Sequence, residues 1–281
     1  MTTTCHTIRH RCARSLLRLA LAGPLILVAF SALADCARVI EVPLAPIGLS
    51  VTSSGTLLSG IYPELLETLG AREKCQFSLV PVPRSRQEFL FESGQADMLI
   101  PASRTPKRDQ LGVFIPLVRN RAMLISIRAP RVPFKNFQEL LDAKSSRVAV
   151  VRGFDYGPAY QGLLLALQKQ GRLVQEVDAI SLARLLKSGV VAYTIMAPSI
   201  LAGSVQADAR IEDLSDKLQY DAMQELPWGE SGLYLSNTAL NEQERAQLQE
   251  MFQRSGVSDL VWKGFQRYYR TEVLKESIRP L

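Results

Sequence analysis

The chain has 281 residues, with 33 Lys and Arg against 27 Asp and Glu, and therefore a formal net charge of +6. Its two histidines, His6 and His10, both lie near the amino terminus. The rest of the chain has no histidine, which excludes Ser-His-Asp and Cys-His hydrolases and any histidine-ligated metal site there. We therefore expect no metal, no cofactor and no catalytic residue.

The first 34 residues have the pattern of a cleavable signal peptide. Four arginines and no acidic residue are followed by the apolar run Leu19–Phe30, and Ala32-Leu33-Ala34 predicts cleavage after Ala34. An uncleaved anchor is the alternative, although the run is shorter than a typical membrane span. Removing the four arginines leaves 29 basic against 27 acidic residues, a net charge of +2 that does not indicate nucleic-acid binding.

Two cysteines remain after the predicted cleavage, Cys36 and Cys75. In an exported chain such a pair suggests one disulfide, which would close a loop of about 40 residues. The alternative is two free thiols in the core. A lipid anchor on Cys36 is disfavoured, because the preceding residue is Asp35 rather than a small one.

The first half of the chain alternates strands and helices. The loop Ala45–Gly60 interrupts the series, and Ser85 is predicted to cap a helix in which Glu88 follows three residues later. The predicted order is a strand at Arg38–Leu44, a helix at Ile61–Arg72, a strand at Cys75–Val82, a helix at Ser85–Gln95 and a strand at Ala96–Ala102. This order implies parallel strands joined by helical crossovers.

A second series of the same kind follows the extended segment Val118–Ala129. It comprises a helix at Asn136–Ala143, a strand at Ser146–Gly153, a helix at Tyr156–Gly171, a strand at Arg172–Val177, a helix at Ile180–Gly189, a strand at Val190–Met196 and a helix from Pro198. A late strand, Ser231–Asn237, precedes the C-terminal helices. Ligands bind at strand tips in open α/β sheets, and the tips at Pro101–Arg108, Arg152–Gly157 and Ala197-Pro198 are candidates.

Three stretches carry a resemblance to a known family. The first runs from GIYPELLETLG through CQFSLVPV and ESGQAD to SRTPKR, with a G-x-x-D turn at Gly94–Asp97 and a T-x-x-R motif at Thr105–Arg108. The others are RVAVVRGFDYG and LLKSGVVAYTIMAPS. In their order and spacing the chain resembles the family 3 extracellular solute-binding proteins, the periplasmic receptors of polar amino-acid ABC transporters, over essentially its whole length after residue 34.

The resemblance implies an α/β fold of two lobes, each a sheet flanked by helices, with a ligand cleft between them. Lobe 1 would comprise residues 36–119 and 229–281, and lobe 2 residues 120–228. The implied protein is a periplasmic monomer and not an enzyme. It would capture a small polar solute bearing a carboxylate by lobe closure and deliver it to a separate membrane permease or sensor.

The resemblance also implies binding residues. Arg108 of the T-x-x-R motif would pair with the ligand carboxylate, as its planar fork of donors allows, and Ser103 would add a hydrogen bond. A helix beginning near Thr105 would add amide donors. The loop of Gly153, Phe154, Asp155 and Tyr156 would contact the same ligand from lobe 2. The alternative is that Thr105 only caps a helix and Arg108 is exposed, as we expect of Arg104 and Lys107.

The sequence departs from the family at three ligand positions, one of which is the aromatic side chain that the family has after the first strand and that PLAPIGLSV lacks. Phe154 replaces a threonine or serine, and Ala197 stands where the family has the aspartate that holds the ligand ammonium. Phe154 or Tyr156 could stack on a ligand, and Asp155 or Glu230 could take a cation. Further pocket candidates are Tyr62, Arg84 and Trp228, with packing or surface exposure as the alternative for each.

Two other functions stay open. A dehydratase-like enzyme on the same scaffold would need Asp155, Glu230 or Tyr156 as its general acid or base. A degenerate receptor or sensor module would act by protein contact alone. The absence of an acid at Ala197 favours that alternative, and the presence of Ser103 and Arg108 argues against it.

Overall fold

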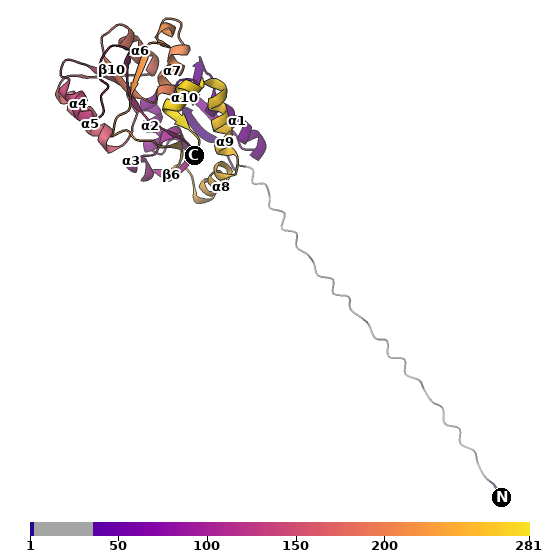
Figure 1. Cartoon of the computed structure of the whole chain (residues 1–281). Helices are drawn as coiled ribbons and strands as arrows, with labels where there is room; N and C mark the ends of the chain where they lie inside the picture. Colours follow the sequence, from indigo (N-terminus) through magenta and orange to yellow (C-terminus); the bar gives the residue numbers. More distant parts are fainter. Residues whose placement is uncertain (3–35) are drawn as a thin grey trace. The chain divides into compact units, whose positions relative to one another are not determined.

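The computed structural model describes residues 1–2 and 36–281, so the predicted signal peptide and its cleavage site lie outside the described residues. Residues 36–281 form an α/β fold in which helices flank two separate groups of strands (Figure 1). Among the described residues, no helix combines the length and apolar character needed to cross a membrane.

The first group of strands contains both ends of the folded chain. One sheet has the order β13-β6-β12-β5, and β1 pairs in parallel with β4. The backbone N–H of Asp97 donates to the Glu41 carbonyl of β1 at 3.1 Å, which places β1 beside β5. The strands are β1 (Ile40–Leu44), β4 (Phe77–Pro81), β5 (Met98–Ser103), β6 (Gly112–Asn120), β12 (Gly229–Ser236) and β13 (Ile278–Arg279).

Helices from opposite ends of the sequence cover these strands. In Figure 1 the yellow helix α9 lies beside the violet helix α1, and their side chains meet where the rings of Tyr62 and Phe265 pack edge to face at 6.3 Å. The helices are α1 (Ile61–Glu73), α2 (Arg84–Glu92), α3 (Pro106–Asp109), α8 (Glu242–Gln253), α9 (Val257–Tyr268) and α10 (Thr271–Ser277).

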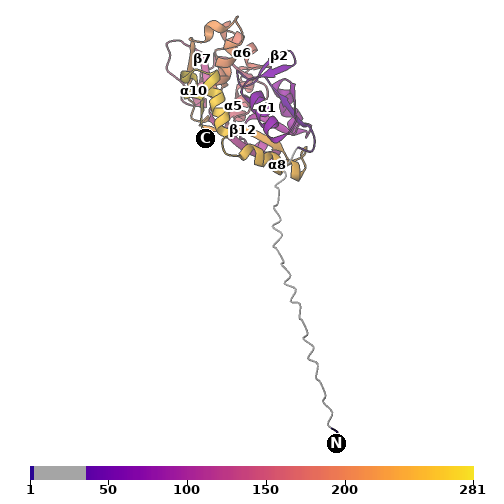
Figure 2. The same cartoon turned by 90° about the vertical axis from the view of Figure 1, so that its right-hand side faces the viewer.

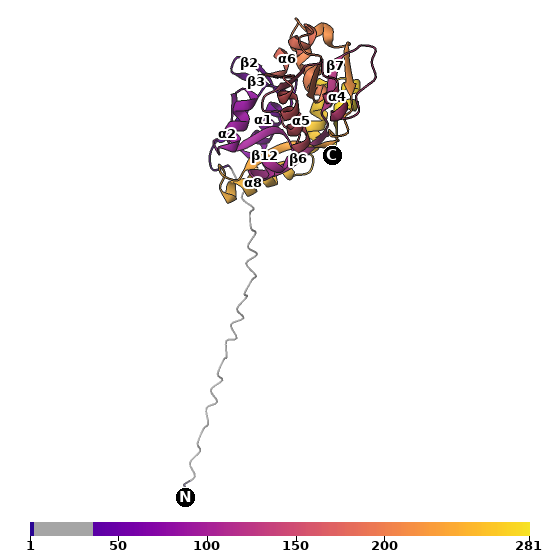
Figure 3. The same cartoon turned by 90° about the vertical axis from the view of Figure 1, so that its left-hand side faces the viewer.

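The second group is a five-stranded sheet of order β11-β7-β10-β8-β9. Successive residues of its central strands enter different cores: Val148 and Val150 pack in one cluster, and Ala149 and Val151 in another. Both faces are therefore covered, as expected for buried strands (Figure 3). The elements are β7 (Met123–Ile127), α4 (Phe137–Asp142), β8 (Val148–Val151), α5 (Pro158–Lys169), β9 (Leu173–Glu176), α6 (Ala179–Lys187), β10 (Tyr193–Met196), α7 (Pro198–Gln206), the 3-10 turn η1 (Glu212–Leu214) and β11 (Leu218–Asp221).

The chain passes between the two sheets twice. The predicted extended segment, 118–129, is divided between β6 in one sheet and β7 in the other, and the chain returns from β11 to β12 (Figure 2). Both crossings meet at Asn120, which pairs with Gly229 and with Ile278. The lobe boundaries inferred from the sequence stay a prediction.

The structure corrects two local predictions, shows a strand that was not predicted, and confirms one prediction. The segment predicted as a loop, Ala45–Gly60, contains the hairpin of β2 (Thr52–Ser54) and β3 (Leu57–Ser59), and β11 was not predicted at all. Helix α2 begins at Arg84 after Pro83 and has no side-chain cap, so Ser85 is not its N-cap. The disulfide between Cys36 and Cys75 is confirmed.

Candidate functional site

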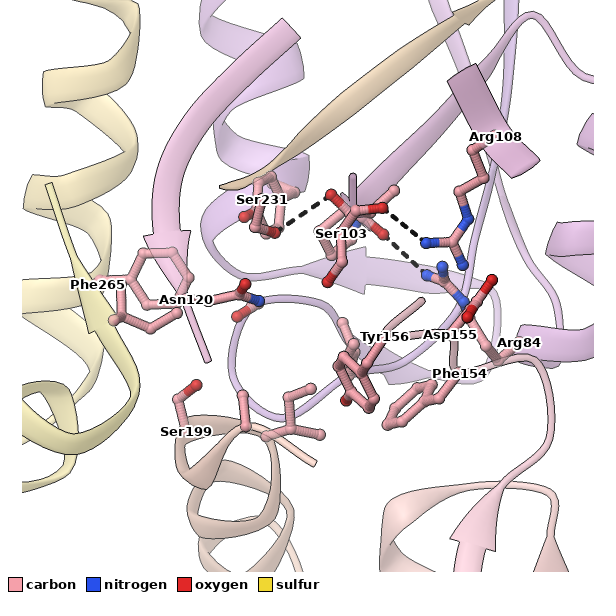
Figure 4. A pocket seen from close by; sticks show the side chains of 18 residues that line it. Arg84, Ser103, Arg108, Asn120, Phe154, Asp155, Tyr156, Ser199, Ser231 and Phe265 are labelled. Atoms are coloured by element: carbon pink, nitrogen blue, oxygen red, sulfur yellow. Dashed lines mark hydrogen bonds between the residues drawn. The ribbon is translucent and has the colours of Figure 1, made fainter. Parts of the chain in front are cut away.

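A pocket lies where the strand tips of the two sheets face each other (Figure 4). The pocket is small: the centre of a water-sized sphere can occupy about 50 Å³ of its interior. Seven of the eight binding residues expected from the sequence line it: Tyr62, Arg84, Ser103, Arg108, Phe154, Asp155 and Tyr156. The eighth, Gly153, lines an adjoining space that shares Arg108 and Phe154 with the pocket.

Arg108 belongs to the single turn α3, which begins after β5. The Thr105 hydroxyl accepts a hydrogen bond from the Arg108 backbone N–H at 3.3 Å, so Thr105 caps the turn as predicted. Arg108 is only 2% exposed, and its Nη1 donates to the Ser103 carbonyl at 2.8 Å. The sequence-based alternative of an exposed Arg108 is therefore wrong. Arg104 and Lys107 are exposed, as expected, and pair with surface carboxylates.

Arg84, the first residue of α2, lies on the same wall of the pocket as Arg108 (Figure 4). Its Nη1 donates to the Pro101 carbonyl at 2.9 Å and to Gln87 Oε1 at 3.2 Å. Its Nε is buried and has no hydrogen-bond partner among the described residues. Burial lowers the pKa of the Arg84 guanidinium, and the positive charge of Arg108 lowers it further, against the opposing effect of Glu88.

Glu88 connects the two arginines, and it lines the adjoining space that contains Gly153 rather than the pocket itself. Its Oε1 accepts hydrogen bonds from Arg84 Nη2 and, at 2.8 Å, from Arg108 Nη2, while its Oε2 accepts from Arg108 Nε at 3.3 Å. Glu88 is 8% exposed. Sequence analysis interpreted Glu88 as part of a helix-capping motif, because nothing in the local pattern indicates a partner twenty residues away.

Aromatic rings of the Gly153 loop also line the pocket, beside Arg84 (Figure 4). The rings of Phe154 and Tyr156 lie 6.2 Å apart, and those of Tyr156 and Tyr160 lie 5.1 Å apart, both nearly perpendicular. Burial raises the pKa of Tyr156, and the nearby positive charges of Arg84 and Arg108 and the Ala197 backbone oppose that rise. A neutral phenol therefore stands beside the position where the resembling family has an aspartate.

Asp155 is the carboxylate that lines the pocket itself. Its Oδ1 accepts hydrogen bonds from the Gly157 backbone at 2.9 Å and from Gln161 Nε2 at 3.0 Å, at the start of α5. The second oxygen stays available to a ligand cation. Glu230, the other candidate, pairs with exposed Arg104 and is not among the residues that line the pocket.

Sequence reasoning missed several polar residues of the lining: Ser50, Asn120, Ser199 and Ser231. Asn120 and Ser231 lie where the chain crosses between sheets, and the Ser231 hydroxyl donates to the Ala102 carbonyl at 3.4 Å. Ser199 directly follows the predicted strand tip Ala197-Pro198, which was the one available signal. Trp228 is outside the lining, and the guanidinium groups of Arg121 and Arg279 each lie over its ring.

The residues that the structure describes contain no cluster of three or more His, Cys, Asp or Glu able to hold a metal ion. The pocket instead offers two guanidinium groups, one carboxylate, several hydroxyls, one amide and a set of aromatic faces. Such a set recognises a small polar molecule by charge and hydrogen bonding.

No protein-family model matches the chain, and no curated protein matches it. Many solved structures match its fold. An arginine-bound amino-acid ABC transporter substrate-binding protein from Streptococcus pneumoniae has a TM-score of 0.63 and 17% identity over 83% of this chain and 97% of that one. A histidine kinase sensor domain similar to periplasmic binding proteins has a TM-score of 0.63 and 17% identity, over 83% and 98%. A double mutant of the VFT2 domain of Bordetella pertussis BvgS has a TM-score of 0.59 and 18% identity, over 82% of this chain and 93% of that one.

These likenesses establish the two-lobed α/β fold of the periplasmic binding proteins, as the sequence predicted. The structural neighbours reported above are a substrate-binding protein, a histidine kinase sensor domain and a VFT2 domain.

Proposed function

We propose that the protein is a periplasmic solute-binding protein, exported through its N-terminal signal peptide and cleaved after Ala34. It binds a small polar solute bearing a carboxylate between its lobes, without chemical conversion, and presents it as a monomer to a separate permease or sensor. The resemblance to family 3 solute-binding proteins supports this role, as does the likeness to the fold of amino-acid binding proteins.

One observation carries the proposal. Arg84 and Arg108 both line the pocket and both are buried, and the Nε–H of Arg84 has no acceptor among the described residues. A buried donor without a partner is costly, so a ligand oxygen that accepts from it would gain more than it would from a solvated group. Arg108 also keeps hydrogens on Nη1 and Nη2 that its three hydrogen bonds do not use.

The remaining pocket residues would contact the other parts of the solute. Ser103, the Gly153 loop and Tyr62 would surround the carboxylate and the body of the molecule, with Phe154 and Tyr156 against its apolar part. Asp155 would bind a cationic group if the solute has one, because Ala197 supplies no carboxylate for it. This arrangement fits an amino acid or a related carboxylate.

The test is a thermal-shift screen of the oxidised protein against amino acids, their deaminated acids and short peptides, followed by calorimetric titration of any hit. A solute at 100 times its Kd stabilises by about 2.7 kcal/mol, or several degrees for a protein of this size. We expect a carboxylate to raise the melting temperature of the wild type, and Arg108→Ala to abolish that increase.

The matched control is Arg104→Ala at the same strand tip. Arg104 is exposed and pairs with Asp109 and Glu230, so its loss should leave the ligand-induced increase unchanged. The ligand-induced change, rather than the melting temperature itself, is compared, because Arg108→Ala also breaks a buried network. If no carboxylate stabilises the wild type, the proposal is wrong.

A second candidate is a sensor or receptor module that acts by protein contact. It is favoured by one observation: the Nε–Nη2 edge of Arg108, which would bind a ligand carboxylate in bidentate fashion, already donates to Glu88. Failure of every solute in the same screen would favour this module over the transport receptor.

A further inference from the structure

Glu88 accounts for the charge that the pocket presents. Its carboxylate accepts three hydrogen bonds from two arginines, and Arg84 Nη2 and Arg108 Nη2 share its Oε1. The two guanidinium groups therefore lie within about two hydrogen-bond lengths of each other. Two buried cations at that separation repel each other strongly, and the intervening carboxylate offsets much of this repulsion.

The donors that Glu88 leaves free are limited in number. Arg108 uses Nε and one hydrogen each of Nη1 and Nη2, and Arg84 uses both hydrogens of Nη1 and one of Nη2. The unused donors are the buried Nε–H of Arg84, one N–H on its Nη2 and one on each terminal nitrogen of Arg108. The pair thus resembles an anion site with one of its two anion positions already filled from inside the protein.

We propose that Glu88 is a resident counter-anion that sets the charge of the solute. This inference rests on the function proposed above. Two arginines and Glu88 carry a net charge of +1, which one carboxylate neutralises, and the remaining pocket carboxylate, Asp155, brings the sum to zero unless a ligand cation pairs with it. The site therefore takes a solute through a single carboxylate and rejects a dianion. Removing the charge of Glu88 opens the second anion position.

Sulfate is the probe, because it is a dianion that bridges two guanidinium groups and needs no knowledge of the natural solute. We would measure melting temperatures of the wild type, Glu88→Gln and Glu92→Gln in sodium sulfate and in sodium chloride at equal ionic strength. We expect Glu88→Gln to show a saturable, sulfate-specific increase of about 3 °C or more. The wild type should show only the gradual, non-saturating stabilisation that sulfate gives any protein by exclusion from its surface.

Glu92→Gln is the matched control, because Glu92 lies one turn further along α2 and pairs with exposed Lys107 rather than with the two arginines. A second variant, Arg84→Gln combined with Glu88→Gln, removes one cation together with the anion and restores a net charge of +1. It should fold, and it should lose the sulfate response.

If Glu88→Gln fails to fold in chloride, refolding in sulfate gives the same information. Recovery of native circular dichroism in sulfate alone supports the inference, and recovery in neither salt overturns it. A wild type that responds to sulfate as strongly as Glu88→Gln, or a folded Glu88→Gln that does not respond, also overturns it.

The experiments distinguish a failure of the proposed solute binding from a failure of the role proposed for Glu88. If carboxylates stabilise the wild type but sulfate does not stabilise Glu88→Gln, the solute-binding function stands and the role given to Glu88 is wrong. If no carboxylate stabilises the wild type while Glu88→Gln takes up sulfate, Glu88 is the resident counter-anion of a pocket that does not serve carboxylate uptake.

Discussion

Gly48 and Gly203 lie in direct backbone contact, although 155 residues separate them in the chain. A Cβ added to Gly203 would stand 2.5 Å from the Leu49 nitrogen and 2.9 Å from the Gly48 Cα. Gly48 precedes the β2–β3 hairpin, and Gly203 lies in α7. The backbones of the two lobes therefore meet beside the pocket at a point where no side chain fits.

Gly203→Ala should force this contact apart. We expect a loss of about 1–3 kcal/mol in the free energy of unfolding, measured in urea, and an increased radius of gyration in solution scattering. The control is Gly162→Ala, another helical glycine, which has open space around it and should stabilise α5 by about 0.5–1 kcal/mol. Equal effects of the two substitutions would contradict the role assigned to the contact.

The Tyr269 side chain packs at the same contact between Gly48 and Gly203. Its hydroxyl accepts a hydrogen bond from the Leu49 backbone N–H at 2.7 Å, so Tyr269→Phe should cost about 1 kcal/mol at neutral pH. Burial raises the pKa of this phenol from 10.0 to about 12. Above pH 10 the unfolded chain releases the proton first, so stability falls as the pH rises from 10 towards 12.

Tyr269→Phe should remove its share of that alkaline loss, about 2 kcal/mol between pH 10 and 12. The difference between wild type and variant is the measured quantity, because other buried tyrosines titrate in both proteins alike. Urea unfolding at pH 8, 10 and 11.5 would provide it. Parallel pH curves for the two proteins would contradict the burial of an ionisable hydroxyl at this position.

The sequence predicted the regular elements well, because apolar periodicity and capping residues are local signals. Asn136 caps α4 as predicted, and Pro158 begins α5. The predictions failed where a residue's partner is remote. Ser85 and Glu88 fit a local capping pattern, but Glu88 instead accepts from Arg108, and the backbone of α2 begins before Ser85.

The candidate site was predictable where a polar residue follows a buried strand, as at Arg108 and Asp155. Asn120 and Ser231 were not predicted, because each is a single polar residue within or at the end of an extended segment. Only the crossing of the two segments between sheets brings them to the pocket. The Nε–H of Arg84 that has no acceptor among the described residues likewise depends on how α2 packs against β5, and it has no local signature.

The disulfide should contribute substantially to stability. Cys36 and Cys75 are 39 residues apart in sequence, and the chain-entropy relation predicts about 4 kcal/mol for a loop of this length. The double substitution to serine should therefore lower the free energy of urea unfolding by about that amount, without changing solute binding well below the new melting temperature. Wild-type protein under reducing conditions should match it. A loss under 1 kcal/mol would indicate that the loop stays ordered in the unfolded state.

Asp97, the last residue of the predicted G-x-x-D turn, connects three strands. Its carboxylate accepts two hydrogen bonds from Arg38, at 2.6 and 2.7 Å, and one from the Glu41 backbone of β1 at 2.7 Å. Its backbone carbonyl accepts from Ser236 of β12 at 2.9 Å. Asp97 is 3% exposed, so this turn has a structural role rather than a place in the pocket.

Asp97→Asn should leave the Arg38 charge without its buried partner. We expect a loss of about 2–3 kcal/mol in the free energy of unfolding, below the range for a fully buried pair because Arg38 is partly exposed. Glu244→Gln is the control, since Glu244 contacts the same guanidinium from α8 near the surface and should cost under about 1 kcal/mol. Hydrogen exchange of the Glu41 amide would localise the effect. Faster exchange in Asp97→Asn alone identifies the connection of β1 to β5 as the point that weakens. Equal losses of unfolding free energy in both variants would mean that the charge of Arg38, and not the buried carboxylate, stabilises this edge of the sheet.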